Sequence, residues 1–128
     1  MIFRHNRKEA RAKDVYKRQV YFLELFHGST IAFKDMALSI LPHLMTTAAR
    51  KNHVKNEIVI LTATSGDTGK AAMAGFADVP GTRIIVFYPK NGVSAIQEKQ
   101  MVTQKGKNTS VVGITGNFDD AYPLPLLL

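Results

Sequence analysis

The sequence predicts an α/β fold in which a parallel β-sheet carries helices on both faces, in three layers. From residue 57 onward, apolar β-branched segments alternate with segments of helical spacing, in the order strand, helix, strand, helix, strand. Alternation of this kind is typical of parallel strands joined by right-handed crossovers. The composition agrees with a globular domain, because 45% of the 128 residues are hydrophobic and 21% are charged.

The first regular elements are expected between residues 20 and 51. Residues 20–26, VYFLELF, form a short apolar and aromatic run that predicts a strand leading into a turn. Further along, apolar residues recur at spacings of three and four, which predicts a helix with one buried stripe. The stripe comprises Ile40, Leu41, Leu44, Met45 and Ala48. Since Pro42 lacks a backbone donor, we expect it in the first turn of a helix capped by Ser39, or at a kink.

Three strands and two helices complete the predicted alternation. Residues 57–63 and 82–89 are almost continuously apolar, which is typical of strands buried on both faces, and residues 109–116 form a third strand. A helix of small residues is expected over 69–77. Ser94 with Gln97 makes a capping box for a helix to about residue 104, and NFDDA, residues 117–121, resembles another helix start. Because ligands bind at the carboxyl ends of parallel strands, the turns after these strands are the candidate positions for chemistry.

Composition excludes several classes of protein. The chain has no cysteine, which excludes disulfides, thiolate metal sites and cysteine nucleophiles. No apolar run reaches the roughly 18 residues of a membrane span, and the charged N-terminus lacks the apolar core of a secretory signal. We therefore expect a cytoplasmic protein without a membrane partner. No spacing among the four histidines suggests a metal site.

The net charge of +7 is concentrated at the N-terminus. Residues 1–19 hold seven basic and two acidic residues, whereas residues 20–128 hold ten and eight. Residues 14–19, DVYKRQ, resemble the translation of a sequencing-library adapter, so we interpret residues 1–19 as an artefact or a disordered basic tail. No pattern of basic and aromatic residues continues beyond them, so we expect no nucleic-acid partner. Residues 122–128, YPLPLLL, are interpreted as a frame error or truncation, which leaves residues 20–121 as a partial α/β domain.

The turn TATSGDTG, after the first of the three alternating strands, has the features of a small-anion site. Backbone N–H groups at the start of the following helix lack intrahelical partners, and they stabilise a carboxylate or a phosphate. The candidate residues of this turn are Thr64, Ser65, Gly66, Asp67 and Thr68. An N-cap turn that satisfies only its own helix is an equal alternative. A Walker-type nucleotide loop is excluded, since the pattern fails at its first glycine and at its final hydroxyl, and no GxGxxG fingerprint is present.

Three motifs carry a resemblance to a known family. They are LELFHGSTIAFKD (residues 23–35), ILTATSGDTG (60–69) and VFYPKNGVSAIQEKQM (86–101). Together they resemble threonine synthase, a pyridoxal-phosphate enzyme of the tryptophan-synthase-β-like fold. The resemblance runs from about residue 23 to residue 121 and departs at Ser29, where the family usually has proline. It implies that the chain is a fragment from the N-terminal half of such an enzyme, and that the fragment is inactive and poorly folded alone.

The resemblance also implies roles for individual residues. Lys34 corresponds to the lysine that bonds covalently to the aldehyde of pyridoxal 5'-phosphate, which requires an amine that can lose its proton. The TSGDTG turn corresponds to the loop that grips the substrate α-carboxylate, so residues 64–68 are substrate-binding candidates. Asp67 is also a candidate cofactor contact, because many relatives carry an asparagine there near the phenolic oxygen. The implied reaction converts O-phospho-L-homoserine and water to L-threonine and phosphate.

Several alternatives remain open. The chain could be a non-catalytic α/β module that binds a phosphate or nucleotide, in which Lys34 is dispensable, or a nucleic-acid binder that uses residues 1–19. It could also be another enzyme of the same fold, such as a threonine dehydratase or cysteine synthase. His27 could contact the substrate phosphate or be a turn histidine bonded to backbone. The oligomeric state is not predicted by the sequence.

Overall fold

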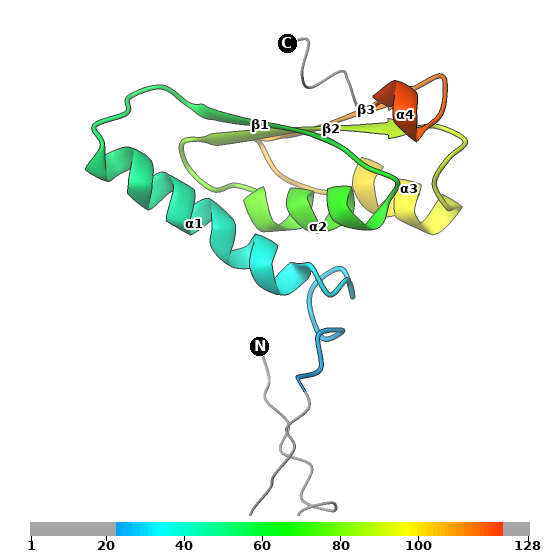
Figure 1. Ribbon diagram of the computed structural model, residues 1–128, viewed down its shortest axis with the longest axis horizontal. Coiled ribbons are helices and arrows are strands. Elements are labelled where there is room, and N and C mark those ends of the chain that lie inside the picture. The colour runs from blue at the N-terminus through cyan, green and yellow to red at the C-terminus, as the bar shows by residue number, and fades with distance from the viewer. Residues whose placement is uncertain (1–22, 122–128) are drawn as a thin grey trace, which may run out of the picture.

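The computed structural model describes residues 23–121 (Figure 1). The interpretations of residues 1–19 and 122–128 therefore lie outside the described residues. The elements are, in chain order, α1 (Asp35–Lys51), β1 (Ile58–Ala63), α2 (Asp67–Phe76), β2 (Thr82–Pro89), α3 (Ala95–Val102), β3 (Thr109–Ile114) and α4 (Phe118–Ala121). The predicted alternation is confirmed. The strand expected over 20–26 is wrong over residues 23–26, which form no regular element and expose Leu23 and Phe26 by 50% and 58%.

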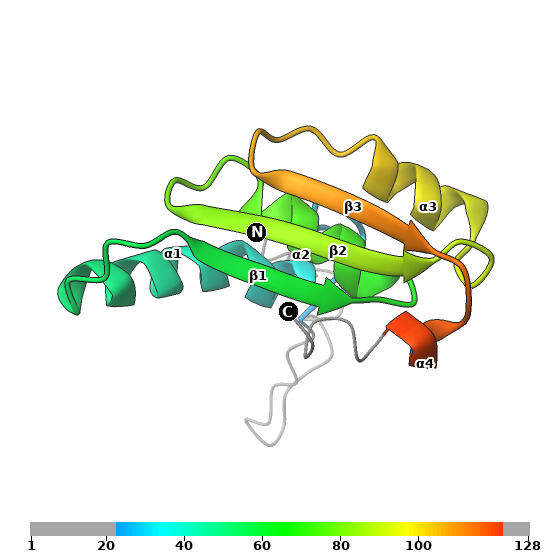
Figure 2. The same cartoon turned by 90° about the horizontal axis from the view of Figure 1, so that it is seen from above.

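The three strands form one parallel sheet in the order β1-β2-β3 (Figure 2). Successive right-handed crossovers that add strands in one direction place their helices on the same face. Accordingly α2 and α3 cover one face of the sheet, and α1 packs beside α2 on that side (Figure 1). The parallel α/β fold is thus confirmed. Within residues 23–121 only the short α4 lies on the side away from the three longer helices.

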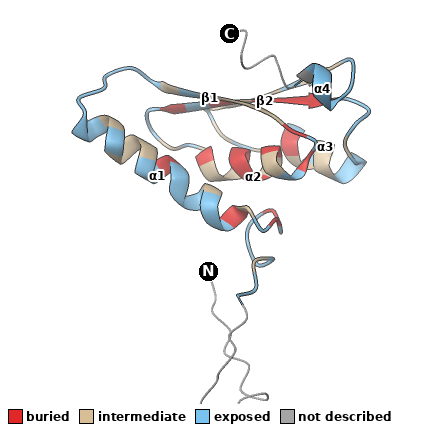
Figure 3. Cartoon of the chain, viewed as in Figure 1, coloured by how far each residue is buried: buried red, intermediate tan, exposed pale blue. Residues whose placement is uncertain are grey.

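The hydrophobic core lies between the sheet and this helical layer (Figure 3). Its cluster comprises Ala72, Met73, Phe76, Ile84, Val86, Tyr88 and Met101. On the opposite face of the sheet, Val59 and Val112 are 51% and 41% exposed. The edge strands, β1 and β3, are therefore covered on one face, and the expectation that residues 57–63 are buried on both faces is wrong within the described residues.

Helix α1 begins earlier than the alternative with Ser39 as its cap expected. Its first residue is Asp35. The preceding Lys34, in the N-cap position, already has helical φ and ψ of −73° and −15°. Ser39 consequently lies inside the helix, where its hydroxyl donates to the carbonyl of Met36 at 2.9 Å, and it caps nothing. Pro42 lies buried in the helix interior rather than in the first turn.

Helices α1 and α2 approach closely at the carbonyl of Leu38, which has no donor four residues later because that position is Pro42. A Cβ built on Gly75 would lie 2.2 Å from this carbonyl oxygen, so only glycine fits there. Leu38 and Met45 pack against the core from this side of α1. Four residues of the predicted stripe are exposed instead: Ile40, Leu41, Leu44 and Ala48. Apolar residues lie on two sides of α1, and the described chain covers only one of them.

Candidate active site

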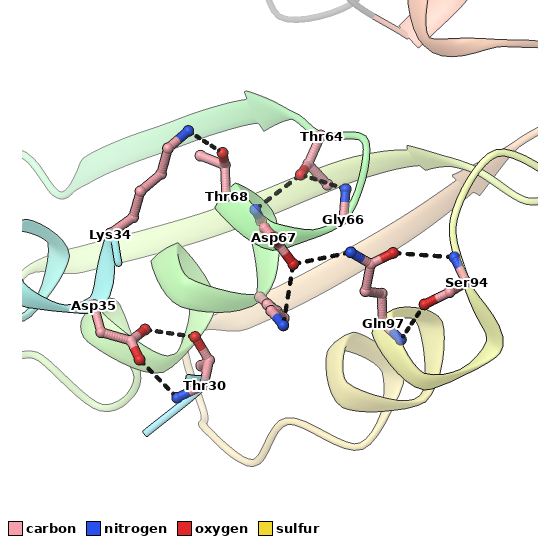
Figure 4. Close-up of polar contacts among 11 residues, drawn as sticks. Thr30, Lys34, Asp35, Thr64, Gly66, Asp67, Thr68, Ser94 and Gln97 are labelled. Atoms are coloured by element: carbon pink, nitrogen blue, oxygen red, sulfur yellow. Dashed lines mark hydrogen bonds and ion pairs between the residues drawn. The ribbon is translucent and has the colours of Figure 1, made fainter. Parts of the chain in front are cut away.

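Lys34 and the TSGDTG turn meet at the start of α1 and α2, near the carboxyl end of β1. The ammonium of Lys34 donates to the hydroxyl oxygen of Thr68 at 2.5 Å, although the two residues are 34 positions apart (Figure 4). The Lys34 side chain is half-buried, and its Nζ lies 5.7 Å from the centroid of the Phe33 ring. The tertiary structure therefore joins two motifs that the sequence singled out separately.

The turn before Lys34 is closed by the carboxylate of Asp35. The backbone N–H of Thr30 donates to Oδ2 of Asp35 at 2.8 Å, and the Thr30 hydroxyl donates to Oδ1 at 2.5 Å. Thr30 and Asp35 are 7% and 8% exposed. A Cβ on Gly28 would lie 2.3 Å from Oδ2 of Asp35, so the chain can pass this carboxylate only as glycine. The buried hydrogen bonds between Thr30 and Asp35 fix the backbone from which the Lys34 side chain extends.

Thr64 organises the anion-site turn. Its hydroxyl oxygen accepts hydrogen bonds from the backbone N–H groups of Gly66 and Gly69, both at 2.9 Å. Its own N–H donates to the carbonyl of Phe87 in β2 at 2.9 Å, and only 2% of the residue is exposed. Because both contacts to its hydroxyl come from the turn, Thr64 shapes the loop from inside.

Three backbone donors of this turn point to an anion. Within residues 23–121, the N–H groups of Ser65, Asp67 and Thr68 donate no hydrogen bond to another protein atom. Gly66 has a φ of 137°, which residues with a side chain rarely adopt, and it lets the chain turn sharply into α2. Free donors at the positive end of a helix dipole stabilise a carboxylate or phosphate. The turn can therefore bind a small anion next to the Lys34 amine.

The carboxylate of Asp67 is turned toward Gln97 of α3 (Figure 4). Its Oδ1 accepts a hydrogen bond from Nε2 of Gln97 at 2.9 Å and lies 3.1 Å from Nζ of Lys70. The hydrogen bond from Gln97, and then Lys70, hold the pKa of Asp67 below its ordinary value of 3.8. Asp67 is thus ionised at neutral pH, and its charge is compensated on the side away from Lys34.

Gln97 is the residue of this region that the sequence analysis missed. It was assigned only to the capping box, which is confirmed: Ser94 N–H donates to Oε1 of Gln97 at 3.1 Å, and Gln97 N–H donates to Oγ of Ser94 at 3.3 Å. The capping box leaves the side-chain NH₂ group free, and this group reaches Asp67. The sequence held one indication of this contact, because both turns were expected to follow parallel strands at the same sheet edge.

The side chain of His27 contacts residues of its own segment. Its Nε2 lies 2.6 Å from Oε2 of Glu24, and its ring centroid lies 4.5 Å from that of Phe26. The contact is to a side chain, not to backbone as the turn-histidine alternative expected, and it leaves the possible phosphate contact untested. In the described part of the chain, no group of three or more histidine or acidic side chains could hold a metal ion.

Solved structures of threonine synthases share the fold of this chain. No family model matches the chain. A crystal structure of threonine synthase from yeast superposes with a TM-score of 0.74 at 38% identity, over 81% of this chain and 22% of that one. A pyridoxal-phosphate-bound threonine synthase from Brucella melitensis superposes with a TM-score of 0.72 at 40% identity, over 79% and 21%. The fold is thus a partial α/β domain of the pyridoxal-phosphate-dependent, tryptophan-synthase-β-like class.

Threonine synthases are also among the proteins of similar sequence. Threonine synthase of Pseudomonas aeruginosa is 45% identical over 104 residues, which is 81% of this chain and 22% of that protein. The predicted resemblance is confirmed: over most of its length the chain matches threonine synthases, and it spans about 22% of the length of the relative from P. aeruginosa.

Proposed function

We propose that this chain forms part of a pyridoxal-phosphate-dependent threonine synthase and supplies the lysine that bonds covalently to the cofactor. One observation carries the proposal, the 2.5 Å hydrogen bond from Lys34 to Thr68, which brings the FKD motif to the TSGDTG turn. The cofactor fits the chemistry of this donor set, because the half-buried primary amine of Lys34 can bond to an aldehyde. The likeness to a pyridoxal-phosphate-bound threonine synthase supports the same cofactor.

Each candidate residue then has a role set by its contacts. The free N–H groups of Ser65, Asp67 and Thr68 receive the substrate α-carboxylate, and the Thr68 hydroxyl holds the Lys34 amine at the edge of this turn. Thr64 and Gly66 act by shaping the turn, since the hydroxyl of Thr64 accepts from its backbone. The role of Asp67 as a cofactor contact stays a prediction, because its carboxylate contacts Gln97 and Lys70.

Bound pyridoxal phosphate would supply an electron sink that stabilises negative charge at the substrate α-carbon. The turn fixes the α-carboxylate, so the α-hydrogen is held in one orientation toward Lys34. Lys34, when its nitrogen is not bonded to the cofactor, accepts the α-proton, moves the β-proton and later returns a proton to the α-carbon. Over the whole reaction, the C–O bond at the γ-carbon of O-phospho-L-homoserine breaks and releases phosphate. The γ-carbon gains a proton, the β-carbon loses one and takes the hydroxyl of water, and L-threonine results.

The 128 residues cover only a part of the related enzymes, so we expect the isolated chain to be inactive. Detectable formation of threonine by the purified 128-residue polypeptide would contradict that expectation. No helix within residues 23–121 is long and apolar enough to span a membrane. The cytoplasmic location expected from the sequence stays a prediction.

The proposal is tested by trapping the lysine in the protein expressed from the complete open reading frame at the genomic locus. The protein is incubated with pyridoxal phosphate, reduced with borohydride, digested and analysed by mass spectrometry. We expect a pyridoxyl group on Lys34, and phosphate release from O-phospho-L-homoserine that Lys34→Ala abolishes. Lys99→Arg, which changes an exposed lysine of α3, is the matched control and should retain both.

A folded protein with unmodified Lys34 would contradict the enzyme proposal. It would favour the non-catalytic anion-binding module, because the free N–H groups of the TSGDTG turn do not depend on Lys34. Binding of inorganic phosphate that survives Lys34→Ala and is lost in Gly66→Ala would identify that second function. Gly66 is the position for this variant, since its φ of 137° makes the turn intolerant of a side chain.

A further inference from the structure

Asp67 presents an electrostatic problem at the proposed substrate turn. Its backbone N–H is one of the three free donors, yet its carboxylate is an anion at the same helix start. A short acidic side chain at a helix N-terminus is itself stabilised by the helix dipole and by free backbone donors. Such a carboxylate would compete with the substrate carboxylate for those donors and would repel it. Other contacts must therefore hold the Asp67 carboxylate away from these backbone donors.

The side chains of Gln97 and Lys70 contact the Asp67 carboxylate. Nε2 of Gln97 donates to Oδ1 of Asp67 at 2.9 Å, and Nζ of Lys70 lies 3.1 Å from the same oxygen. The Asp67 side chain is 62% exposed, so no packing fixes its orientation, and these polar contacts determine where the carboxylate points. Lys70 belongs to α2 itself, whereas Gln97 reaches across from α3 (Figure 4).

The Gln97 side chain is itself held in one place. Its Oε1 accepts from Ser94 N–H at 3.1 Å in the capping box of α3, which orients the amide so that the NH₂ group faces Asp67. A Cβ on Gly66 would lie 2.5 Å from Cδ of Gln97. The amide therefore lies across the glycine of the substrate turn, and the missing side chain of Gly66 makes room for it.

We propose that Gln97 is a positioning residue for the substrate turn: from α3, together with Lys70, it holds the Asp67 carboxylate off the free N–H groups that receive the substrate carboxylate. The substrate part of this proposal rests on the proposed function, whereas the hold on Asp67 does not. Gln97 thereby links the turn after β1 to the turn after β2, and the capping box of α3 becomes part of the substrate site.

Gln97→Glu tests the proposal with a change of one atom. Glutamate at this position still accepts from Ser94 N–H and preserves the capping box, so α3 keeps its start. The donor to Asp67 is replaced by a second carboxylate oxygen, which converts the hydrogen bond into repulsion. In the complete protein, we expect the pKa of Asp67, followed by carboxyl-carbon NMR and assigned with Asp67→Asn, to rise by about one unit. We expect the KM for O-phospho-L-homoserine to rise about tenfold while kcat changes less than about threefold.

A charge control and a rescue variant separate this effect from others. Gln104→Glu adds the same charge just beyond the end of α3, where the native amide donates to the carbonyl of Lys105 and to no other atom of residues 23–121, and it should change neither quantity. In the double variant Asp67→Asn with Gln97→Glu, the amide at position 67 donates to the carboxylate at position 97, so the hydrogen bond is restored in the opposite direction. Its KM should return to that of Asp67→Asn alone, a rescue that a merely structural role of Gln97 would not produce.

The outcomes separate the two proposals. An unchanged pKa of Asp67 in Gln97→Glu would show that Gln97 does not hold the carboxylate, and it would overturn the inference. A raised pKa with an unchanged KM would overturn the positioning role. Absence of a pyridoxyl group on Lys34 in the unmodified protein would contradict the proposed function and the substrate part of the inference. The titration of Asp67 would still decide whether Gln97 holds it.

Discussion

Replacing Thr64 with valine should destabilise the fold through the anion-site turn alone. The Thr64 hydroxyl accepts from the N–H groups of Gly66 and Gly69, and all three residues are buried. Valine has nearly the same shape and keeps the methyl group that lies against Gly69, so it opens no cavity. Two buried backbone donors are then left without an acceptor.

The expected cost follows from these two donors. A buried donor left unsatisfied costs about 1–3 kcal/mol, so the pair predicts a loss of about 2–6 kcal/mol in the free energy of unfolding. Urea unfolding of the protein from the complete reading frame, followed by circular dichroism, measures this loss. Thr64→Ser is the control, because it keeps the hydroxyl and loses only a methyl group, at a cost of about 1 kcal/mol. The reasoning would be refuted if valine were within about 0.5 kcal/mol of the native protein, the range of ordinary surface substitutions.

Three further predictions concern residues of the helices and of strand β2. Gly75→Ala should destabilise the protein by about 1–3 kcal/mol in the same urea assay, because the new Cβ meets a backbone carbonyl of α1 at 2.2 Å; a neutral result would contradict the close approach. The lowered pKa of Asp67, caused first by Gln97, stabilises the fold above the ordinary value of 3.8, and this contribution is lost as the pH falls through the folded value. Asp67→Asn should therefore flatten the fall in stability below about pH 4, and an unaltered profile would speak against the pair. The hydrogen bond to Glu98, and then burial, raise the pKa of Tyr88 above 10.0; the neutral phenol then stabilises the fold below that value, and the contribution is lost as the pH rises through the raised pKa. Tyr88→Phe should remove this alkaline loss and cost about 1 kcal/mol at neutral pH, whereas an unchanged alkaline limb would exclude the Tyr88 contribution.

Local pattern predicted most of the elements correctly. The three parallel strands, the helix rich in small residues and the capping box of Ser94 and Gln97 all lie where short-range periodicity placed them. These features depend on neighbours within a few residues, so the sequence encodes them directly. The start of α1 was missed because Lys34 and Asp35 carry no capping signature, and the turn before them is closed by the buried pair of Thr30 and Asp35.

The sequence by itself determined the order of strands and helices, because each element is a pattern of adjacent residues. It predicted the anion-site turn from a local pattern as well, and the role of Lys34 from the resemblance to threonine synthase. Only the tertiary structure decided which side of α1 is buried, since apolar residues lie on two sides and packing against α2 selects one. It alone joined Lys34 to Thr68 and Gln97 to Asp67, pairs that are 34 and 30 residues apart. The physical reason is that parallel strands bring their following turns to one edge of the sheet, and no short-range pattern records which side chains meet there.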